Sequence, residues 1–282
     1  MADDERLDLP GQVILPRKGS VQWPNNARLA VAVTFDLYGS EAYRTLQIIG
    51  SSYDFAPRRG AWRVLESLEK LGVPATFHIP GITAEAYPEI VKAIHGSTHE
   101  VAALGYRHEP MWQLSHEDTR EAAKQAMHAL GEVTGQAPTG WRTPQARPNE
   151  FTLPVLCELG YEWDSTLRND DIPYGMTFDT GTLVEIPVRG PNHYSHYFSM
   201  PGPSMTTGEA FAVWQEEVDI MLAEAEQEPT MYAIALHPAF AGRPGDQAAM
   251  EQLLTSLVQR RDVWFARCGD IAQWWRDNAH WA

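Results

Sequence analysis

The chain has 282 residues, of which 44% are hydrophobic and 10% aromatic, so it can bury a large core and is neither disordered nor fibrous. Its 37 acidic and 22 basic residues give a net charge of −15 with neutral histidines, which repels phosphate backbones and anionic lipids. The acidic N-terminus lacks the order of a signal peptide, and no apolar run reaches the length of a membrane span. We therefore expect a cytoplasmic protein whose partners include neither nucleic acid nor membrane.

Apolar runs of strand length alternate with helical patterns along the chain. Residues 1–28 are polar and rich in Pro, Gly and Asn, and are predicted to form an N-terminal arm ahead of one domain over 29–282. The continuous apolar run at 29–35 is typical of a strand that is buried on both faces of a parallel sheet. Helical spacing of apolar residues follows at 60–71 and stops at Gly72.

The same alternation continues to the end of the chain. Further strands are predicted at residues 73–79, 99–104, 139–142, 161–163, 182–187, 231–236 and 263–266. Further helices are predicted at residues 83–95, 115–134, 149–159, 208–226, 246–260 and from Gly269 onward. Because strands and helices alternate without a linker, the sequence predicts one α/β domain, and its seven or eight strands favour a closed or nearly closed barrel.

Four ionisable residues follow predicted strands, at the ends where parallel α/β folds place their sites. Asp36 directly follows the first strand, and His237 directly follows the strand at 231–236. His108 and Arg142 follow two of the strands between them. Each of these residues alone also fits a structural role, as a cap, a rim hydrogen bond or an ion-pair partner. Their joint placement at strand ends indicates a shared site.

The residues around these positions resemble the polysaccharide deacetylase family, which has the NodB-homology fold, a distorted (β/α) barrel. The matching motifs are Thr34-Phe-Asp36, Gly105-Tyr-Arg-His-Glu-Pro110, Arg142-Thr-Pro144 and Leu236-His237, within a resemblance over residues 28–275. An intracellular branch of cyclic-imide hydrolases, allantoinase-like enzymes and a peptidoglycan-deacetylase-like protein is similar in further strings. These are Gly60-Ala-Trp-Arg63, Asn169-Asp-Asp-Ile-Pro-Tyr174, Leu183-Val-Glu-Ile-Pro187, Gly242-Arg-Pro244 and Val263-Trp-Phe-Ala-Arg267. We therefore expect a single-domain α/β barrel of the NodB type.

The resemblance implies a hydrolase that acts on carbon–nitrogen bonds other than peptide bonds. It implies that Asp36 is the general base that activates water, that Arg142 holds this carboxylate, and that His237 protonates the leaving nitrogen. We expect the substrate to contact a second set of residues, namely His108, Tyr38, Trp112, Asp171 and His196, the last in an aromatic loop at 192–198.

The metal site of the family is altered in this sequence. Metal-dependent members carry a second Asp two residues after the first, and a His-x-x-x-His pair in the second motif. Tyr38 stands at the position of that Asp and Leu104 at that of the first His, so His108 alone remains of three protein ligands. A divalent ion needs about three protein donors and an open water position. We expect no cofactor and no conventional zinc site, with a rearranged site at His108, His193 and His196 as an alternative.

Two functions stay open at this point. The leading one is hydrolysis of an N-acetyl group or a small cyclic amide or imide, in a small molecule or an N-acetylated sugar. The rival is a degenerate family member that binds a ligand or partner without turnover, which the two substituted metal positions favour and the three retained catalytic residues oppose. The Trp-rich tail at 274–281 and the N-terminal arm predict a homo-oligomer.

Overall fold

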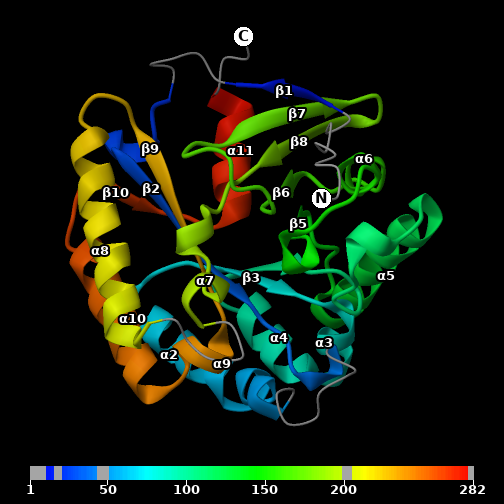
Figure 1. Ribbon diagram of the computed structural model, residues 1–282, viewed down its shortest axis with the longest axis horizontal. Helices are drawn as coiled ribbons and strands as arrows, with labels where there is room; N and C mark the ends of the chain where they lie inside the picture. Colours follow the sequence, from blue (N-terminus) through cyan, green and yellow to red (C-terminus); the bar gives the residue numbers. More distant parts are fainter. Residues whose placement is uncertain (1–10, 16–20, 43–50, 199–204, 279–282) are drawn as a thin grey trace, which may run out of the picture.

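Strands line the centre of the molecule and helices cover them on the outside (Figure 1). The computed structural model describes residues 11–15, 21–42, 51–198 and 205–278. The strands are β1 (Gln12–Ile14), β2 (Leu29–Asp36), β3 (Thr76–Ile79), β4 (Glu100–Ala103), β5 (Gly140–Trp141), β6 (Trp163–Asp164), β7 (Tyr174–Phe178), β8 (Gly181–Glu185), β9 (Thr230–Leu236) and β10 (Val263–Phe265). The α-helices are α2 (Ala61–Leu71), α3 (Gly81–Ala86), α4 (Pro88–His95), α5 (His116–Thr134), α6 (Thr152–Glu158), α7 (Ser195–Phe198), α8 (Thr207–Glu224), α9 (Pro238–Ala241), α10 (Pro244–Val258) and α11 (Cys268–Asn278).

The parallel strands form a nearly closed barrel in the order β9-β2-β3-β4-β5-β6-β8. One edge of β2 pairs with β9, whereas its other edge is shared: β10 pairs with residues 29–31 and β3 with residues 34–36. Between β8 and β9 the barrel is bridged by the backbone pair His193–Ala235. β7 pairs antiparallel with β8, and β1 pairs antiparallel with β7. This arrangement confirms the expected α/β barrel.

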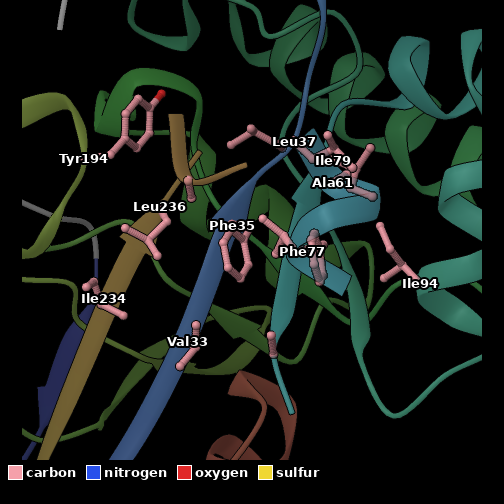
Figure 2. Close-up of a cluster of buried hydrophobic side chains, with 14 of the residues drawn as sticks. Val33, Phe35, Leu37, Ala61, Phe77, Ile79, Ile94, Tyr194, Ile234 and Leu236 are labelled. Carbon is pink, nitrogen blue, oxygen red and sulfur yellow. The ribbon is translucent and has the colours of Figure 1, made fainter. Parts of the chain in front are cut away.

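Strand β2 separates two packing layers. Its odd-numbered residues Val33 and Phe35 belong to the cluster between the strands and the outer helices, where Phe35 stacks on Phe77 of β3 with ring centroids 4.9 Å apart (Figure 2). Its even-numbered residue Ala32 belongs to a second cluster on the opposite face. Because side chains alternate along a strand, Asp36 points to the same inner face as Ala32.

Small side chains on the inner face leave room for large aromatic ones. The second cluster contains Ala30, Ala32, Ala102, Ala233 and Ala235 together with Trp163 and Trp275. Helix α11 supplies Trp275 and begins at the amino ends of two strands. The Cys268 N–H donates to Oγ1 of Thr76, the first residue of β3, at 2.9 Å. The Gly269 N–H donates to Oε2 of Glu100, the first residue of β4, at 3.0 Å. α11 thus covers the amino-terminal end of the barrel, opposite to the expected site.

Several elements differ from their sequence predictions, and the short elements β1, α7 and α9 have no predicted counterpart. The single helix predicted at 83–95 is two helices, α3 and α4, because Pro88 lacks the backbone N–H that a continuous helix needs. Tyr87 between them takes a non-helical φ of −133°. Strand β7 is missing from the prediction, because its outer position in the sheet leaves it without the continuous apolar run of the barrel strands. Among the described helices, none is both long and apolar enough to cross a membrane.

The N-terminal arm and the C-terminal tail contact each other within one chain. Trp23 of the arm packs on Trp274 with ring centroids 4.6 Å apart, and Trp275 is fully buried. Part of the aromatic surface that predicts self-association is therefore used inside the chain. Residues 1–10 and 16–20 of the arm and 279–282 of the tail lie outside the described residues, and self-association stays a prediction.

The contact between Gly140 and Trp163 predicts how Gly140→Ala changes stability. A Cβ at Gly140 would lie 1.9 Å from a ring carbon of the buried Trp163, so the indole or the strand must shift. We expect a loss of about 1–3 kcal/mol in the free energy of unfolding, measured by urea denaturation. Gly208→Ala is the matched control, because a Cβ at Gly208 meets nothing within 4 Å, and we expect a change of no more than about 0.5 kcal/mol. Equal losses in the two variants would contradict the packing argument.

Candidate active site

The three residues that are expected to be catalytic lie at the carboxyl-terminal end of the barrel. Asp36 is the last residue of β2, Arg142 directly follows β5, and His237 directly follows β9. The Arg142 backbone N–H donates to the carbonyl of Ala103, which keeps the residue in register with β4. The strands therefore bring together side chains that are about two hundred residues apart in the chain.

Asp36 and Arg142 form a buried ion pair. Nη1 of Arg142 donates to Oδ1 of Asp36 at 2.8 Å, and the side chains are 3% and 7% exposed for Arg142 and Asp36 respectively. Nη2 donates to the hydroxyls of Thr34 and Ser165, and Nε donates to the Ser165 carbonyl. A guanidinium with this many acceptors has one orientation, so Arg142 fixes the position of the Asp36 carboxylate.

His193 is a second partner of Asp36. Its Nε2 lies 3.3 Å from Oδ2 of Asp36. The backbone N–H of Ser195 donates to Nδ1 of His193, so the ring proton is on Nε2 and faces the carboxylate. The sequence predicts that this loop lines a pocket, with metal binding through His193 as the alternative, and does not predict the contact with Asp36. The signal that places His193 here is its bridge to Ala235 of β9, which depends on the tertiary structure.

The two partners set the charge of Asp36. Burial alone would raise the pKa of the carboxyl, but the Arg142 guanidinium and the His193 hydrogen bond outweigh it and hold the pKa well below its usual range. Asp36 is therefore ionised at every pH at which the protein is expected to work. The pKa of His193 is lowered by burial, so its imidazole is neutral at pH 7.

His237 presents a hydrogen-bond donor without an acceptor. Its Nδ1 accepts from the Ala239 N–H at 3.0 Å, so Nε2 carries the proton. His237 is fully buried, and within the described part of the chain Nε2 has no hydrogen-bond partner. The rings of Tyr38, Tyr53 and Tyr194 surround the imidazole, with centroids 4.4, 5.0 and 5.3 Å away. Burial lowers the pKa of His237 to about 3, so the imidazole is neutral.

Two of the weaker sequence strings hold this part of the site together. Gly60 ends the π-helix η3 (Ala56–Gly60), and a Cβ on it would lie 2.1 Å from the carbonyl oxygen of Pro238. A Cβ on Gly242 would lie 2.3 Å from the Cα of Gly60. This close backbone contact joins the start of α9, which follows His237, to the segment that follows Tyr53, and only glycine permits it.

His108 occupies a strained turn beside Tyr38. Its φ of 57° lies in the left-handed region, which is uncommon for a residue other than glycine. The Glu109 carboxylate closes the turn by accepting from the backbone N–H groups of Tyr106 and Arg107. The His108 ring lies 4.7 Å from that of Tyr38, and burial lowers the pKa of His108 to about 4. The turn therefore presents a neutral imidazole at the site.

Comparison with known proteins relates this geometry to a family. A model described as polysaccharide deacetylase matches residues 28–163. A peptidoglycan deacetylase of Helicobacter pylori is 32% identical over 77% of this chain and 84% of its own length. The chain belongs to the polysaccharide deacetylase family. This confirms the family that the sequence motifs indicate.

Two solved structures share the whole fold of this chain. A Mycobacterium smegmatis protein assigned as a polysaccharide deacetylase is 31% identical, with a TM-score of 0.86 over 94% of this chain and 95% of its own. The Puue allantoinase has a TM-score of 0.83 over 92% of this chain and 94% of its own at 24% identity, which shows a common fold. Membership supports the coarser functional expectation, a hydrolase that acts on carbon–nitrogen bonds.

The residues at the family's metal position do not fit a zinc ion. The Tyr38 hydroxyl, where the resemblance places a ligating Asp, is 2.8 Å from the Tyr194 hydroxyl, and Leu104 is buried and apolar. A rearranged site through His193 does not fit either, because its two ring nitrogens face Asp36 and Ser195. No three His, Cys, Asp or Glu side chains of the described residues are grouped to hold a metal ion.

Asp171 lies at the other end of the barrel from Asp36, Arg142 and His237. Its carbonyl accepts from the backbone N–H of Met231 at the start of β9, whereas His237 follows the end of that strand, roughly 20 Å away along β9. The Asp171 carboxylate is exposed and pairs with Arg189 at 3.4 Å. The structure therefore does not bring Asp171 to Asp36, Arg142 and His237, because the segment that contains it packs against the first residues of β9.

Trp112 and His196 make contacts on the surface of the molecule. The Arg147 guanidinium lies over the Trp112 ring, 3.9 Å from its centroid. His196 is exposed on α7, where its ring packs edge-on against Tyr197. Of the five residues expected to contact the substrate, Tyr38 and His108 lie beside His237 or each other. The other three, Trp112, His196 and Asp171, have other neighbours.

The low pKa of Asp36 predicts a pH-dependent stability. Asp36→Asn leaves Arg142 buried beside a neutral side chain, and we expect a loss of about 3 kcal/mol at pH 7. Because the pKa is lower in the folded chain than in the unfolded one, the carboxylate stabilises the fold above about pH 4, and this contribution falls as the pH drops further. The difference between wild type and variant should therefore shrink between pH 4 and 2, measured by urea unfolding.

Glu158→Gln serves as the control for this experiment. It breaks the exposed Arg120–Glu158 pair, whose side chains are 36% and 40% exposed, and should cost less than about 1 kcal/mol at pH 7. An Asp36→Asn variant as stable as wild type at pH 7 would contradict the buried-pair argument.

Proposed function

We propose that this protein hydrolyses a non-peptide carbon–nitrogen bond, in an N-acetyl group or in a small cyclic amide or imide, with water activated by Asp36. The observation that carries the proposal is the buried Asp36–Arg142 pair near the unpartnered N–H of His237 in the described chain. Asp36 and His237 directly follow the paired residues Phe35 and Leu236 of the neighbouring strands β2 and β9, which brings the two groups close together. A base and a hydrogen-bond donor placed at the same end of the barrel are the groups that amide hydrolysis requires.

The proposed reaction begins with the removal of a proton from water by Asp36. The water oxygen attacks the carbonyl carbon, and the Nε2–H of His237 donates to the oxygen on which negative charge develops. The C–N bond then breaks, and the leaving nitrogen takes the proton that Asp36 holds. Because a carboxylate with so low a pKa is a weak base, the donor on His237 must act in the same step.

The neutral state of His237 changes the role that the resemblance implies. A general acid that protonates the leaving nitrogen would be an imidazolium at pH 7, whereas burial lowers the pKa of His237 to about 3. A neutral imidazole with its proton on Nε2 is still a good donor to an oxyanion. We therefore propose that His237 stabilises charge and that Asp36 returns the proton.

The surroundings of His237 support a small planar substrate. Tyr38, Tyr53 and Tyr194 offer ring faces and edges, which bind the face of a sugar or a small ring. The names of related proteins support both substrate types: the Helicobacter pylori relative is a peptidoglycan deacetylase, and the structural neighbour is an allantoinase. Asp36 and His237 would act in the same way on either carbonyl.

A ligand-binding protein without turnover is the second candidate. It is favoured by the two hydrogen-bonded oxygens of Asp36, one facing Arg142 and the other facing His193, which leave the carboxylate less basic. Hydrolysis of any compound in a panel of imides, hydantoins and N-acetyl sugars would decide against this candidate.

Asp36→Asn is expected to abolish most of the hydrolysis. General-base assistance contributes on the order of 10²–10⁴-fold, so kcat per folded molecule should fall by about that factor. The folded fraction has to be measured in parallel by circular dichroism, because the same change destabilises the chain. Normal turnover by the folded variant would overturn the proposed role of Asp36.

Glu100→Gln is the matched control for Asp36→Asn. Glu100 is another carboxyl shielded from water, which raises its pKa to about 7, but it lies at the amino end of β4, opposite to the site. We expect the Glu100→Gln variant to keep the wild-type kcat. Equal losses in the two variants would show that any buried carboxyl change impairs the protein.

The pKa values of the site predict a flat pH profile. Asp36 is ionised throughout, His237 and His108 have pKa values of about 3 and 4, and that of His193 is also lowered. For a substrate that does not titrate in this range, kcat/KM should be constant within about twofold from pH 5 to 8. A descending limb near pH 6.5 that disappears in His237→Gln would instead show an imidazolium acid.

A further inference from the structure

Arg168 lies at the same end of the barrel as Asp36, just beyond β6. The backbone before it is fixed, because the Leu167 N–H donates to Oε1 of Glu185 at 2.8 Å and the Leu167 carbonyl accepts from Val188 at 3.0 Å. The Nη1 atom of Arg168 lies 3.7 Å from the position of a Cβ on Gly190. Gly190 begins the turn that leads to His193, so the guanidinium lies beside the loop that contacts Asp36.

Arg168 has no acceptor among the described residues, unlike the neighbouring arginines. Arg142 is paired with Asp36, and Arg189 is paired with Asp171 and Glu217. The side chain of Arg168 is exposed, yet burial is the main cause that lowers its pKa, and the charges of Arg142 and Asp36 also act on it. A partly desolvated guanidinium without a counter-ion is stabilised by an anion that binds to it.

The turn that Arg168 contacts holds a second unsatisfied polar group. The Asn192 side chain is 1% exposed, and neither its amide oxygen nor its nitrogen has a hydrogen-bond partner in the described chain. A buried amide in this state normally faces a ligand or an ordered water. The Asn192 amide thus offers one acceptor and one neutral donor, and Arg168 offers a cationic donor beside the same turn.

The charges around Asp36 are largely compensated within the site. Asp36 is balanced by Arg142, and the histidines around it are neutral. Asp164 and Glu185 face each other on the paired strands β6 and β8. Burial raises the pKa of Asp164, and it raises the pKa of Glu185 well above its usual range, so the two carboxyls do not both carry a charge at pH 7. In a chain of net charge −15, Arg168 is therefore a cation at this end of the barrel that forms no ion pair with a described residue.

We propose that Arg168 selects substrates that carry a carboxylate near the amide that is cleaved, by a forked hydrogen-bonded pair between guanidinium and carboxylate. The proposal rests on the proposed hydrolysis at Asp36 and names the substrate class of that site. A guanidinium matches a carboxylate through two parallel N–H donors, a geometry that a neutral hydroxyl cannot use.

The test compares two substrate pairs, and the members of each pair differ by one carboxylate-bearing substituent. The pairs are N-acetylmuramic acid with N-acetylglucosamine, and hydantoin-5-acetic acid with hydantoin. We expect wild type to favour the anionic member of the pair that it cleaves. Arg168→Gln should lower kcat/KM for the anionic member by about 10–100-fold and for the neutral member by less than about twofold. Arg168→Lys should restore part of the preference, because it keeps the charge and loses the fork.

Arg261→Gln is the matched control, because Arg261 is an exposed arginine that precedes β10 at the opposite end of the barrel. It removes the same charge and should leave the anionic preference unchanged. Equal use of anionic and neutral substrates by wild type, or an unchanged preference in Arg168→Gln, would overturn the inference while leaving the hydrolase function intact.

Failure of the proposed function has a different outcome. If wild type cleaves none of the four compounds, their binding by calorimetry decides the inference. Tighter binding of an anionic member that is lost in Arg168→Gln would support the carboxylate site without hydrolysis. Equal binding of both members, or the same affinity in Arg168→Gln, would contradict it.

Discussion

The buried ion pair between Arg142 and Asp36 joins the site to the closure of the barrel. Arg142 follows β5, and its acceptors lie on β2 and in the segment after β6. The hydroxyl of Ser165, one of these acceptors, donates to the carbonyl of Ile186 after β8. One guanidinium therefore connects four strands, and neither charge can be buried alone at tolerable cost. The geometry of the proposed active site and the closed sheet therefore depend on each other.

The imidazoles around Asp36 show what this burial does to function. Three histidines, at positions 108, 193 and 237, approach one carboxylate, yet each has its pKa lowered by burial. They contribute N–H donors and ring faces, and no positive charge at neutral pH. Among the described residues near Asp36, the positive charges belong to arginines. In the proposed function, charge recognition and proton transfer are therefore carried out by different residue types.

The sequence predicts the parts of the site that regular structure positions. Asp36, Arg142 and His237 each follow an apolar strand run, and the barrel places all three at one end. The contact of His193 with Asp36 and the position of Arg168 could not be predicted, because both residues lie in irregular loops. The places of these loops depend on a single bridge to β9 and on buried carboxyls at the ends of β6 and β8. The prediction of the fold has the same limit. Apolar runs indicate the strands of the barrel, whereas β7 has no such run and is not predicted.

The shared edge of β2 determines when the molecule can form during synthesis. β10 pairs with residues at the start of β2 that are 234 positions earlier, and β9 pairs with the whole length of the same strand. A nascent chain that has released β2 to β8 from the ribosome therefore holds a central strand with most of its edges unpaired. Such a chain has to avoid aggregation until its last fifth emerges. C-terminal truncation would thus affect the first strand of the barrel as much as the last.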